Sequence, residues 1–382
     1  MQGTVDSRFS RVRDVFAEGF VAHGELGASV AVTLDGKLVV DLWDGFMDKA
    51  KTRPWTESTI ANVFSVTKGW TAICAHRLVD QGKLDLDRPV ADYWPEFAQG
   101  DKSDLRVRAL LDHRAGLPAI RELLAPEALF DWSTMTAALA KETPWWTPET
   151  KHGYHAVTYG WLVGEVIRRV SGKMPGVFFR DEIAGPLGID AHIGLDAADD
   201  ARCADLRFLR REPGSSPTFA QRLMTAPESM AARAFTNPAA LVMPDIALSR
   251  AWRGAELPSI NGHGTARANA RLYGALACGG ALDGVQVLTS ASIDRARTER
   301  SNGEDAILGV PTRFGLGFML SEPEASFGPN DGAFGHPGMG GALGFADPEA
   351  RIGFGYVPNM LGTHIQLDPR AMRLIDALYA SL

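Results

Sequence analysis

The feature that most constrains the fold is a pair of β-rich runs within residues 27–45, separated by Asp35-Gly36. A two-residue hairpin turn of type I′ needs positive φ at both central positions, and an Asp-Gly pair supplies it, so the two runs should form an antiparallel hairpin. A helical pattern precedes them over residues 7–23, where apolar side chains recur at Phe9, Val12, Val15, Phe16 and Phe20. A chain that opens helix, strand, turn, strand does not begin a doubly wound parallel sheet.

The far end of the chain is also β-rich, whereas the middle is helical. Apolar, glycine-punctuated runs predict strands of a meander at Phe314–Leu320, Gly341–Phe345 and Arg351–Val357. Helical patterns cover 66–82, Thr134–Lys141, Tyr159–Ser171, Ala266–Cys278 and Pro369–Leu382. Residues 198–240 are the least regular, and the sequence EPGSSP predicts a loop at 212–217.

These patterns predict an α+β fold in which strands from both chain ends share one antiparallel sheet, flanked by the terminal helices. Residues 1–74 and 241–382 would form this α/β domain, and residues 75–240 a mostly helical inserted domain. The length of 382 residues fits two or three domains. A ligand site would then lie in the cleft between the two parts.

The composition is that of an ordinary globular protein and argues against several kinds of partner. Hydrophobic residues make up 45% of the chain and the net charge is −7, so we expect no binding to nucleic acid. The N-terminal segment lacks the apolar core of a signal peptide, and no apolar stretch is long enough to cross a bilayer. Cys74, Cys203 and Cys278 are scattered, which indicates neither a zinc site nor a disulfide framework. We therefore expect a cytoplasmic protein without a metal, cofactor or membrane partner.

The first candidate for chemistry is Ser65-Val66-Thr67-Lys68, at the start of the helical pattern over 66–82. If Ser65 opens that helix, Lys68 lies one turn further along the same face and can reach the Ser65 hydroxyl. The free N–H groups of a helix N-terminus favour an oxyanion, and burial lowers the pKa of a lysine so that it can act as a base. The alternative is a capping serine followed by a solvated lysine.

Two further segments carry weaker signals. Tyr154 stands just before the helical run that begins at Tyr159, where a phenol could relay a proton; the alternative is an amphipathic anchor bonded to backbone. His336-Pro337-Gly338 lies among glycines at a strand edge, where a backbone N–H could complete an oxyanion hole; the alternative is a glycine-rich hairpin with a structural histidine. The sequence has no GxSxG, HExxH, Walker A or GxGxxG motif, which argues against α/β-hydrolase, metalloprotease and nucleotide-binding chemistry.

The order of these motifs resembles the serine β-lactamase and penicillin-binding-protein superfamily, and within it the class C-related family VIII carboxylesterases. Three longer segments add to the resemblance: GKLDLDRPVADYWPEF at 82–97, LLDHRAGLP at 110–118 and FGHPGMGGALGFADPE at 334–349. The similarity extends over about residues 10–380. It implies an antiparallel sheet with flanking helices plus a mostly helical domain, which agrees with the fold predicted above.

The resemblance also implies roles for individual residues. Ser65 would be the nucleophile that carries a transient acyl group, and Lys68 and Tyr154 would share the work of the general base. The backbone N–H groups of Ser65 and Met339 would hold the oxyanion, since Pro337 has no N–H. No cofactor is implied.

The departures from the β-lactamase pattern point to esters. Lactamases carry Tyr-x-Asn and Lys-Thr-Gly, where this chain has Tyr154-His155-Ala156 and His336-Pro337-Gly338. The Asn amide and the cationic clamp for a substrate carboxylate are therefore missing, and a mostly neutral histidine replaces the clamp poorly. We expect an uncharged small-molecule ester or lactone as substrate, contacted by His336 and Gly338.

An apolar acyl or alcohol pocket would be lined by Trp145 and Trp146, and also by Trp161; packing in a core or lid is the alternative for each. A serine carboxylesterase for short-chain esters is the leading hypothesis. An acyltransferase, a weak β-lactamase or a D-amino peptidase would use the same residues. A non-catalytic scaffold would share only the fold, and labelling of Ser65 by a fluorophosphonate would separate it from the enzymes.

Overall fold

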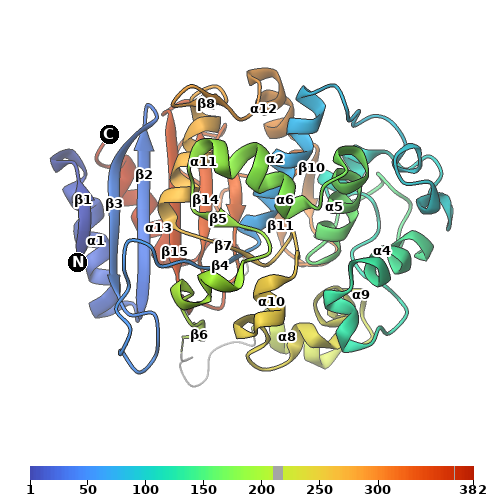
Figure 1. Ribbon diagram of the computed structural model, residues 1–382, viewed down its shortest axis with the longest axis horizontal. Helices are drawn as coiled ribbons and strands as arrows, with labels where there is room; N and C mark the ends of the chain where they lie inside the picture. Colours follow the sequence, from blue (N-terminus) through green and yellow to red (C-terminus); the bar gives the residue numbers. More distant parts are fainter. Residues whose placement is uncertain (210–217, 365) are drawn as a thin grey trace.

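The computed structural model describes residues 1–209, 218–364 and 366–382 (Figure 1). The loop predicted at 212–217 lies outside these residues. The strands are β1 (Gln2–Val5), β2 (Gly27–Leu34), β3 (Lys37–Gly45), β4 (Ala61–Phe64), β5 (Ala191–His192), β6 (Arg207–Phe208), β7 (Gly262–Gly264), β8 (Ala281–Leu282), β9 (Val285–Gln286), β10 (Ser301–Glu304), β11 (Pro311–Phe314), β12 (Met319–Leu320), β13 (Phe334–Pro337), β14 (Leu343–Asp347), β15 (Ile352–Pro358) and β16 (Met360–Leu361).

The α-helices are α1 (Ser10–Ala22), α2 (Val66–Asp80), α3 (Val107–Leu111), α4 (Trp132–Lys141), α5 (Thr158–Ser171), α6 (Pro175–Phe179), α7 (Gly185–Leu187), α8 (Phe219–Thr225), α9 (Met230–Thr236), α10 (Arg250–Gly254), α11 (Ala266–Ala277), α12 (Ser290–Arg297) and α13 (Pro369–Tyr379). The 3₁₀ segments are η1 (Ser7–Phe9), η2 (Val90–Asp92), η3 (Pro95–Ala98), η4 (Pro126–Phe130), η6 (Ala197–Arg202), η7 (Ala239–Val242) and η8 (Ile246–Leu248), and η5 (Arg180–Ala184) is π-helical.

One antiparallel sheet joins the two ends of the chain. Its strand order is β1-β3-β2-β15-β14-β13-β12-β11-β10, so every strand comes from residues 2–45 or 301–358. In Figure 1 the blue N-terminal strands lie beside the red C-terminal ones. The α+β fold class predicted from the sequence is confirmed. The hairpin between β2 and β3 turns at Asp35 and Gly36, whose φ angles are 50° and 75°.

The strand predicted at Phe314–Leu320 is wrong as one element. The structure divides it into β11, which ends at Phe314, and β12, which begins at Met319. Gly317 has a φ of 91°, which an extended strand does not allow, and the chain reverses there so that Phe314 pairs with Met319.

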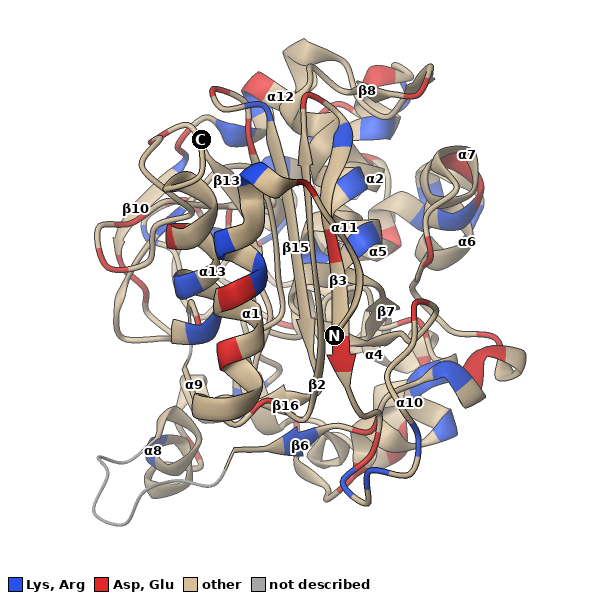
Figure 2. Cartoon of the chain, turned by 90° about the vertical axis from the view of Figure 1, so that its left-hand side faces the viewer, with Lys and Arg blue, Asp and Glu red and all other residues tan. Residues whose placement is uncertain are grey.

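Helices cover both faces of the sheet. In Figure 2 the sheet is seen nearly along its edge, with α1 and α13 side by side on one face and α2 and α11 on the other. Phe345 and Phe354 stack across β14 and β15 at a ring distance of 5.0 Å, and both are buried. The same strands carry glycines at the alternate positions. One face of the sheet therefore has large side chains here, and the other face has none.

A row of glycines lets α11 approach the sheet closely. Gly344 of β14 pairs with Gly355 of β15, and Gly353 lies on the same face. A Cβ atom on Gly353 would lie 2.2 Å from the nitrogen of Gly274 in α11, and one on Gly355 would lie 2.1 Å from the oxygen of Ala266. The helix backbone therefore packs against strand backbone, and any side chain at these positions would push the two apart.

The helical middle of the chain packs on α2. Helices α5 and α6 both contact α2, and α4 packs on α5. Helix α5 ends as its sequence predicts, because Gly172 takes a left-handed φ of 74°. The predicted domain boundary between residues 74 and 75 lies inside α2, and the division into two domains stays a prediction. Within the described ranges, no helix combines the length and the apolar character that a membrane crossing requires.

The glycine row predicts a stability effect. Gly353→Ala should lower the free energy of unfolding by about 1–3 kcal/mol, since the added methyl group overpacks the contact with α11. Urea denaturation followed by circular dichroism measures this loss. Gly332→Ala is the control, because its Cβ would meet only the flexible end of Arg297, and it should change stability by less than about 0.5 kcal/mol. Equal stability of both variants would contradict the close approach.

Candidate active site

Ser65 stands at the junction between a strand and a helix. Strand β4 ends at Phe64, which has a φ of 45°, and α2 begins at Val66. A left-handed phenylalanine is a strained conformation that needs support from its surroundings. Thr67 supplies it, because its hydroxyl donates to the Phe64 oxygen and accepts a hydrogen bond of 2.8 Å from the Gly262 N–H. The Ser65 hydroxyl makes no capping bond to α2 and is left free for other partners.

Lys68 is fully buried one turn further along α2. Its Nζ lies 2.7 Å from the Ala156 oxygen, 3.0 Å from the Ser259 oxygen and 3.1 Å from the Ser65 Oγ. Burial lowers the pKa of the Lys68 amine well below its usual value, since charge is costly to desolvate. The structure thus rules out a solvated lysine beside a capping serine.

The three contacts of the Lys68 Nζ are those that a neutral amine can make. A neutral amine has two N–H groups and one lone pair. The carbonyls of Ala156 and Ser259 take the two N–H groups, and the lone pair is then left for the proton of the Ser65 hydroxyl, 3.1 Å away. The arrangement prepares Lys68 to receive that proton.

Tyr154 is the third side chain that lies beside Ser65 and Lys68. Its side chain is buried, its ring lies under the Lys68 Nζ at 4.7 Å, and its hydroxyl shares a hydrogen bond with the Ser65 side chain. Burial raises the pKa of the Tyr154 phenol, and the bond to Ser65 opposes that rise. Asp305 holds the Tyr154 backbone, because its Oδ1 accepts the Tyr154 N–H at 2.9 Å.

Two buried histidines support Tyr154 without facing solvent. His113 has a left-handed φ of 61° and packs on the Tyr154 ring at 5.1 Å. Its Nδ1 accepts the His155 N–H at 3.1 Å. The Nδ1–H of His155 donates to the Gly153 oxygen at 2.7 Å, and its Nε2 accepts from the Leu117 N–H at 2.9 Å. Burial lowers the pKa of both rings, so they stay neutral and hold the loop in one conformation.

His336 lies on β13, with its ring 6.0 Å from that of Tyr154. Its Nδ1–H donates to the Pro337 oxygen at 2.7 Å, whereas its Nε2 is buried without a partner among the described residues. Burial lowers the pKa of His336 to about 3. The ring is therefore neutral at any working pH and offers only a bare lone pair.

Residues 338–341 form a tight turn after β13. The Gly341 N–H bonds to the Gly338 oxygen at 3.1 Å, and Gly340 has a φ of 86°, as the third residue of a type II turn requires. A Cβ on Gly338 would lie 2.1 Å from the oxygen of Val63, so the turn packs against β4 two residues before Ser65. Among the described residues, no group accepts a hydrogen bond from the backbone N–H of Met339 or of Ser65.

The tryptophans have different surroundings. The Trp145 indole N–H donates to the Ala119 oxygen at 2.9 Å, and the Arg121 guanidinium covers the ring. Trp146 packs edge-on against His155 at 6.0 Å, and its indole N–H has no partner among the described residues. Trp161 lies on α5 and is buried in the hydrophobic core. Trp146 thus lies beside the loop that carries Tyr154, and the roles of Trp145 and Trp146 in substrate binding stay predictions.

The sequence analysis missed the groups that tune these residues. The Lys68 amine is held by main-chain oxygens of Ala156 and Ser259, which any residue type supplies and no motif reveals. Asp305 and His113 are visible as residues but become partners of Tyr154 only through the fold. Within the part of the chain that the structure describes, no three His, Cys, Asp or Glu side chains gather in a way that could hold a metal ion.

Known proteins are similar to this chain in sequence and in fold. A family model described as beta-lactamase matches residues 12–377. The esterase/beta-lactamase LipL of Mycobacterium tuberculosis is 38% identical over 363 residues, which cover 94% of this chain and 83% of LipL.

Solved structures extend the similarity over the whole chain. A penicillin-binding protein homologue from Caulobacter crescentus has 42% identity and a TM-score of 0.91, and a family VIII carboxylesterase has 41% identity and a TM-score of 0.90. Each comparison covers 100% of this chain and 99% of the other. The chain belongs to the beta-lactamase family and is a hydrolase with the fold that beta-lactamases share with esterases.

Proposed function

We propose that the protein is a serine carboxylesterase that cleaves short, uncharged esters through an acyl-enzyme on Ser65. The observation that carries this proposal is the position of the buried Lys68 amine, bonded to two carbonyls and 3.1 Å from the Ser65 Oγ. The similarity to LipL and to a family VIII carboxylesterase supports ester chemistry, because LipL is named an esterase/beta-lactamase and the second protein a carboxylesterase.

Acylation follows from the proton positions in the site. Ser65 Oγ attacks the ester carbon while its proton passes to the neutral Lys68 amine. The free N–H groups of Ser65 and Met339 donate hydrogen bonds to the oxyanion of the tetrahedral intermediate. When the bond to the alcohol oxygen breaks, Tyr154 gives its proton to the departing oxygen and recovers one from the Lys68 ammonium. Burial raises the pKa of Tyr154, so the phenol relays a proton and Lys68 is the base.

Deacylation repeats the same steps with water as the nucleophile. Water attacks the acyl carbon, its proton passes through Tyr154 to Lys68, and the second tetrahedral intermediate uses the same two N–H groups. When the acyl bond to Ser65 breaks, the serine oxygen takes a proton back from Lys68. The acid is released and every group returns to its first state.

The substrate class follows from His336. A neutral ring whose only free atom is an acceptor lone pair repels a carboxylate and cannot replace a lysine clamp. An uncharged ester makes no such demand. A β-lactamase activity would need a cation for the substrate carboxylate, and His336 does not supply it.

Removal of the nucleophile tests the proposal directly. Ser65→Ala should lower kcat/KM for p-nitrophenyl acetate at least ~10³-fold, because the acyl-enzyme cannot form. Ser58→Ala, at an exposed serine in the preceding loop, should keep full activity. Parallel assays with p-nitrophenyl butyrate, p-nitrophenyl octanoate and nitrocefin rank the substrate classes. Activity that survives in Ser65→Ala would identify a different nucleophile.

The lowered pKa of Lys68 predicts the pH profile. The wild-type kcat/KM should rise with pH as the Lys68 ammonium loses its proton and level off well below the usual lysine pKa of 10.5. Lys68→Arg cannot lose its proton and should reduce kcat/KM at least ~10³-fold between about pH 5 and 9. Initial rates across this range measure both effects. A normal profile in Lys68→Arg would transfer the role of base to Tyr154.

A change of charge at His336 tests the substrate class. His336→Lys should raise the ratio of nitrocefin to p-nitrophenyl butyrate turnover about 10-fold, since an ammonium group can pair with the lactam carboxylate. His364→Lys adds the same charge at an exposed position and should leave the ratio unchanged. An unchanged ratio in His336→Lys would show that His336 does not face the substrate carboxylate.

A further inference from the structure

Arg370, near the start of α13, uses all five N–H donors of its guanidinium group. Nε and Nη2 bind the Asp368 carboxylate at 2.9 and 3.0 Å. Nη1 binds Oε2 of Glu25 at 3.1 Å and the Met360 oxygen at 2.8 Å. The second N–H of Nη2 binds the Gly340 oxygen at 2.9 Å. One side chain thus connects the loop after α1, the turn after β13, strand β16 and the cap of α13.

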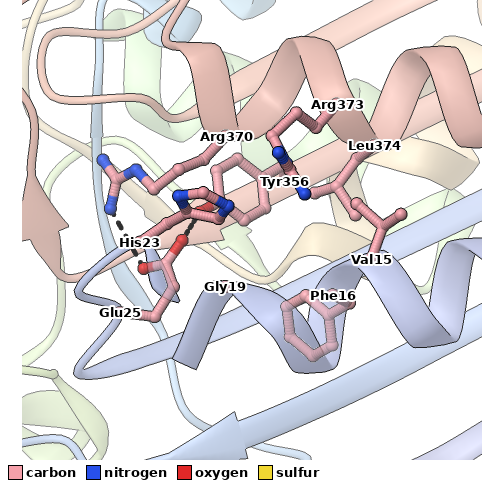
Figure 3. A pocket seen from close by; sticks show the side chains of 9 residues that line it. All are labelled: Val15, Phe16, Gly19, His23, Glu25, Tyr356, Arg370, Arg373 and Leu374. Atoms are coloured by element: carbon pink, nitrogen blue, oxygen red, sulfur yellow. Dashed lines mark hydrogen bonds and ion pairs between the residues drawn. The ribbon is translucent and has the colours of Figure 1, made fainter. Parts of the chain in front are cut away.

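The cluster around this arginine lies deep in the molecule. The exposed fractions of the Arg370, Glu25 and Asp368 side chains are 6%, 2% and 4%. In Figure 3 Glu25 lies between Arg370 and Tyr356 and bonds to both. Buried charges persist only where their hydrogen bonds are satisfied, and here each guanidinium donor has a partner. The arginine is therefore held in one orientation.

The turn at residues 338–341 needs an anchor of this kind. Three of its four residues are glycines, which restrain the backbone least, and Met339 as a whole residue is 47% exposed. The Gly340 oxygen accepts two hydrogen bonds, one of 3.0 Å from the Gly362 N–H and one from Arg370. Because a carbonyl has two lone pairs, these two bonds fix the plane of the peptide between Gly340 and Gly341, at the end of the turn that carries Met339.

We propose that Arg370 is a positioning residue for hydrolysis, which holds the 338–341 turn so that the Met339 N–H points at the developing oxyanion. The proposal rests on the ester hydrolysis proposed above. Arg370 contacts neither substrate nor Ser65 and acts only through the Gly340 oxygen. The glycines give the turn its shape, and the arginine on the far side of the sheet supplies its rigidity.

The substitution Arg370→Lys separates the hydrogen bond to the Gly340 oxygen from the positive charge of the side chain. Arg370→Lys keeps a cation beside Glu25 and Asp368, but a single ammonium cannot span the carboxylates and the Gly340 oxygen together. It should lower kcat for p-nitrophenyl butyrate about 10–100-fold, as expected for a misplaced oxyanion donor. KM should change less than about threefold, because acylation and deacylation both pass through an oxyanion and slow together. Rates are divided by active sites titrated with a fluorophosphonate.

The matched control is Arg373→Met, one turn along α13. Arg373 also ties α13 to α1, through Glu18, but makes no bond to the turn. It should keep wild-type kcat even where its melting temperature falls. A second variant, Arg370→Gln with Asp368→Asn, removes the contact and one pair of opposite charges while an amide still caps α13, and it should show the same loss of kcat.

The outcomes separate this proposal from the proposed function. If wild-type hydrolysis is lost in Ser65→Ala while both Arg370 variants keep kcat per active site within about twofold, the positioning role is wrong and the esterase stands. A rise in KM alone, or the same loss of kcat in Arg373→Met, would also overturn it. If the wild type hydrolyses no ester, both proposals fall.

Discussion

The arrangement of the whole site depends on one buried amine. Lys68 is buried, and no carboxylate of the described residues pairs with it, so main-chain carbonyls, the Ser65 hydroxyl and the Tyr154 ring are its polar contacts. One carbonyl comes from Ala156, on the loop before α5, and the other from Ser259, on the loop before β7. These two loops must therefore meet at α2. The hydrogen bonds of the Lys68 amine form only when the helical middle of the chain packs against α2.

Glycine serves two different purposes in the late strands. On β14 and β15 its lack of a side chain lets α11 lie against strand backbone. In the 338–341 turn its positive φ angles give a tight reversal that leaves the Met339 N–H without a partner in the described chain. A side chain would be excluded by helix backbone in the first case and by turn conformation in the second. The same residue type therefore stabilises the core and shapes the edge of the site.

The sequence predicts what local chemistry determines and misses what only distant segments create. The Asp35-Gly36 turn and the end of α5 at Gly172 follow from backbone preference, and both are found. The spacing of Ser65 and Lys68 likewise places both on one face of α2. The two carbonyls that hold Lys68 have no signature in residue type, and four separate segments build the Arg370 cluster. The two turns around Gly317 and Gly340 depend on tertiary packing. The apolar pattern of residues 314–320 therefore predicts one strand where the structure has a turn at Gly317.

The electrostatics of the site argue for a neutral substrate independently of any motif. Burial lowers the pKa values of Lys68 and His336 and raises that of Tyr154, so it disfavours the charged form of all three side chains. Lys68, Tyr154 and His336 therefore offer a substrate carboxylate no cationic partner, while burial in the site would remove that carboxylate from water. In the mechanism proposed above, transfer of the Ser65 proton forms an ammonium on Lys68 together with the oxyanion near the N–H groups of Ser65 and Met339. The proposed site would therefore stabilise the charges of the transition state more than it stabilises the bound, uncharged ester.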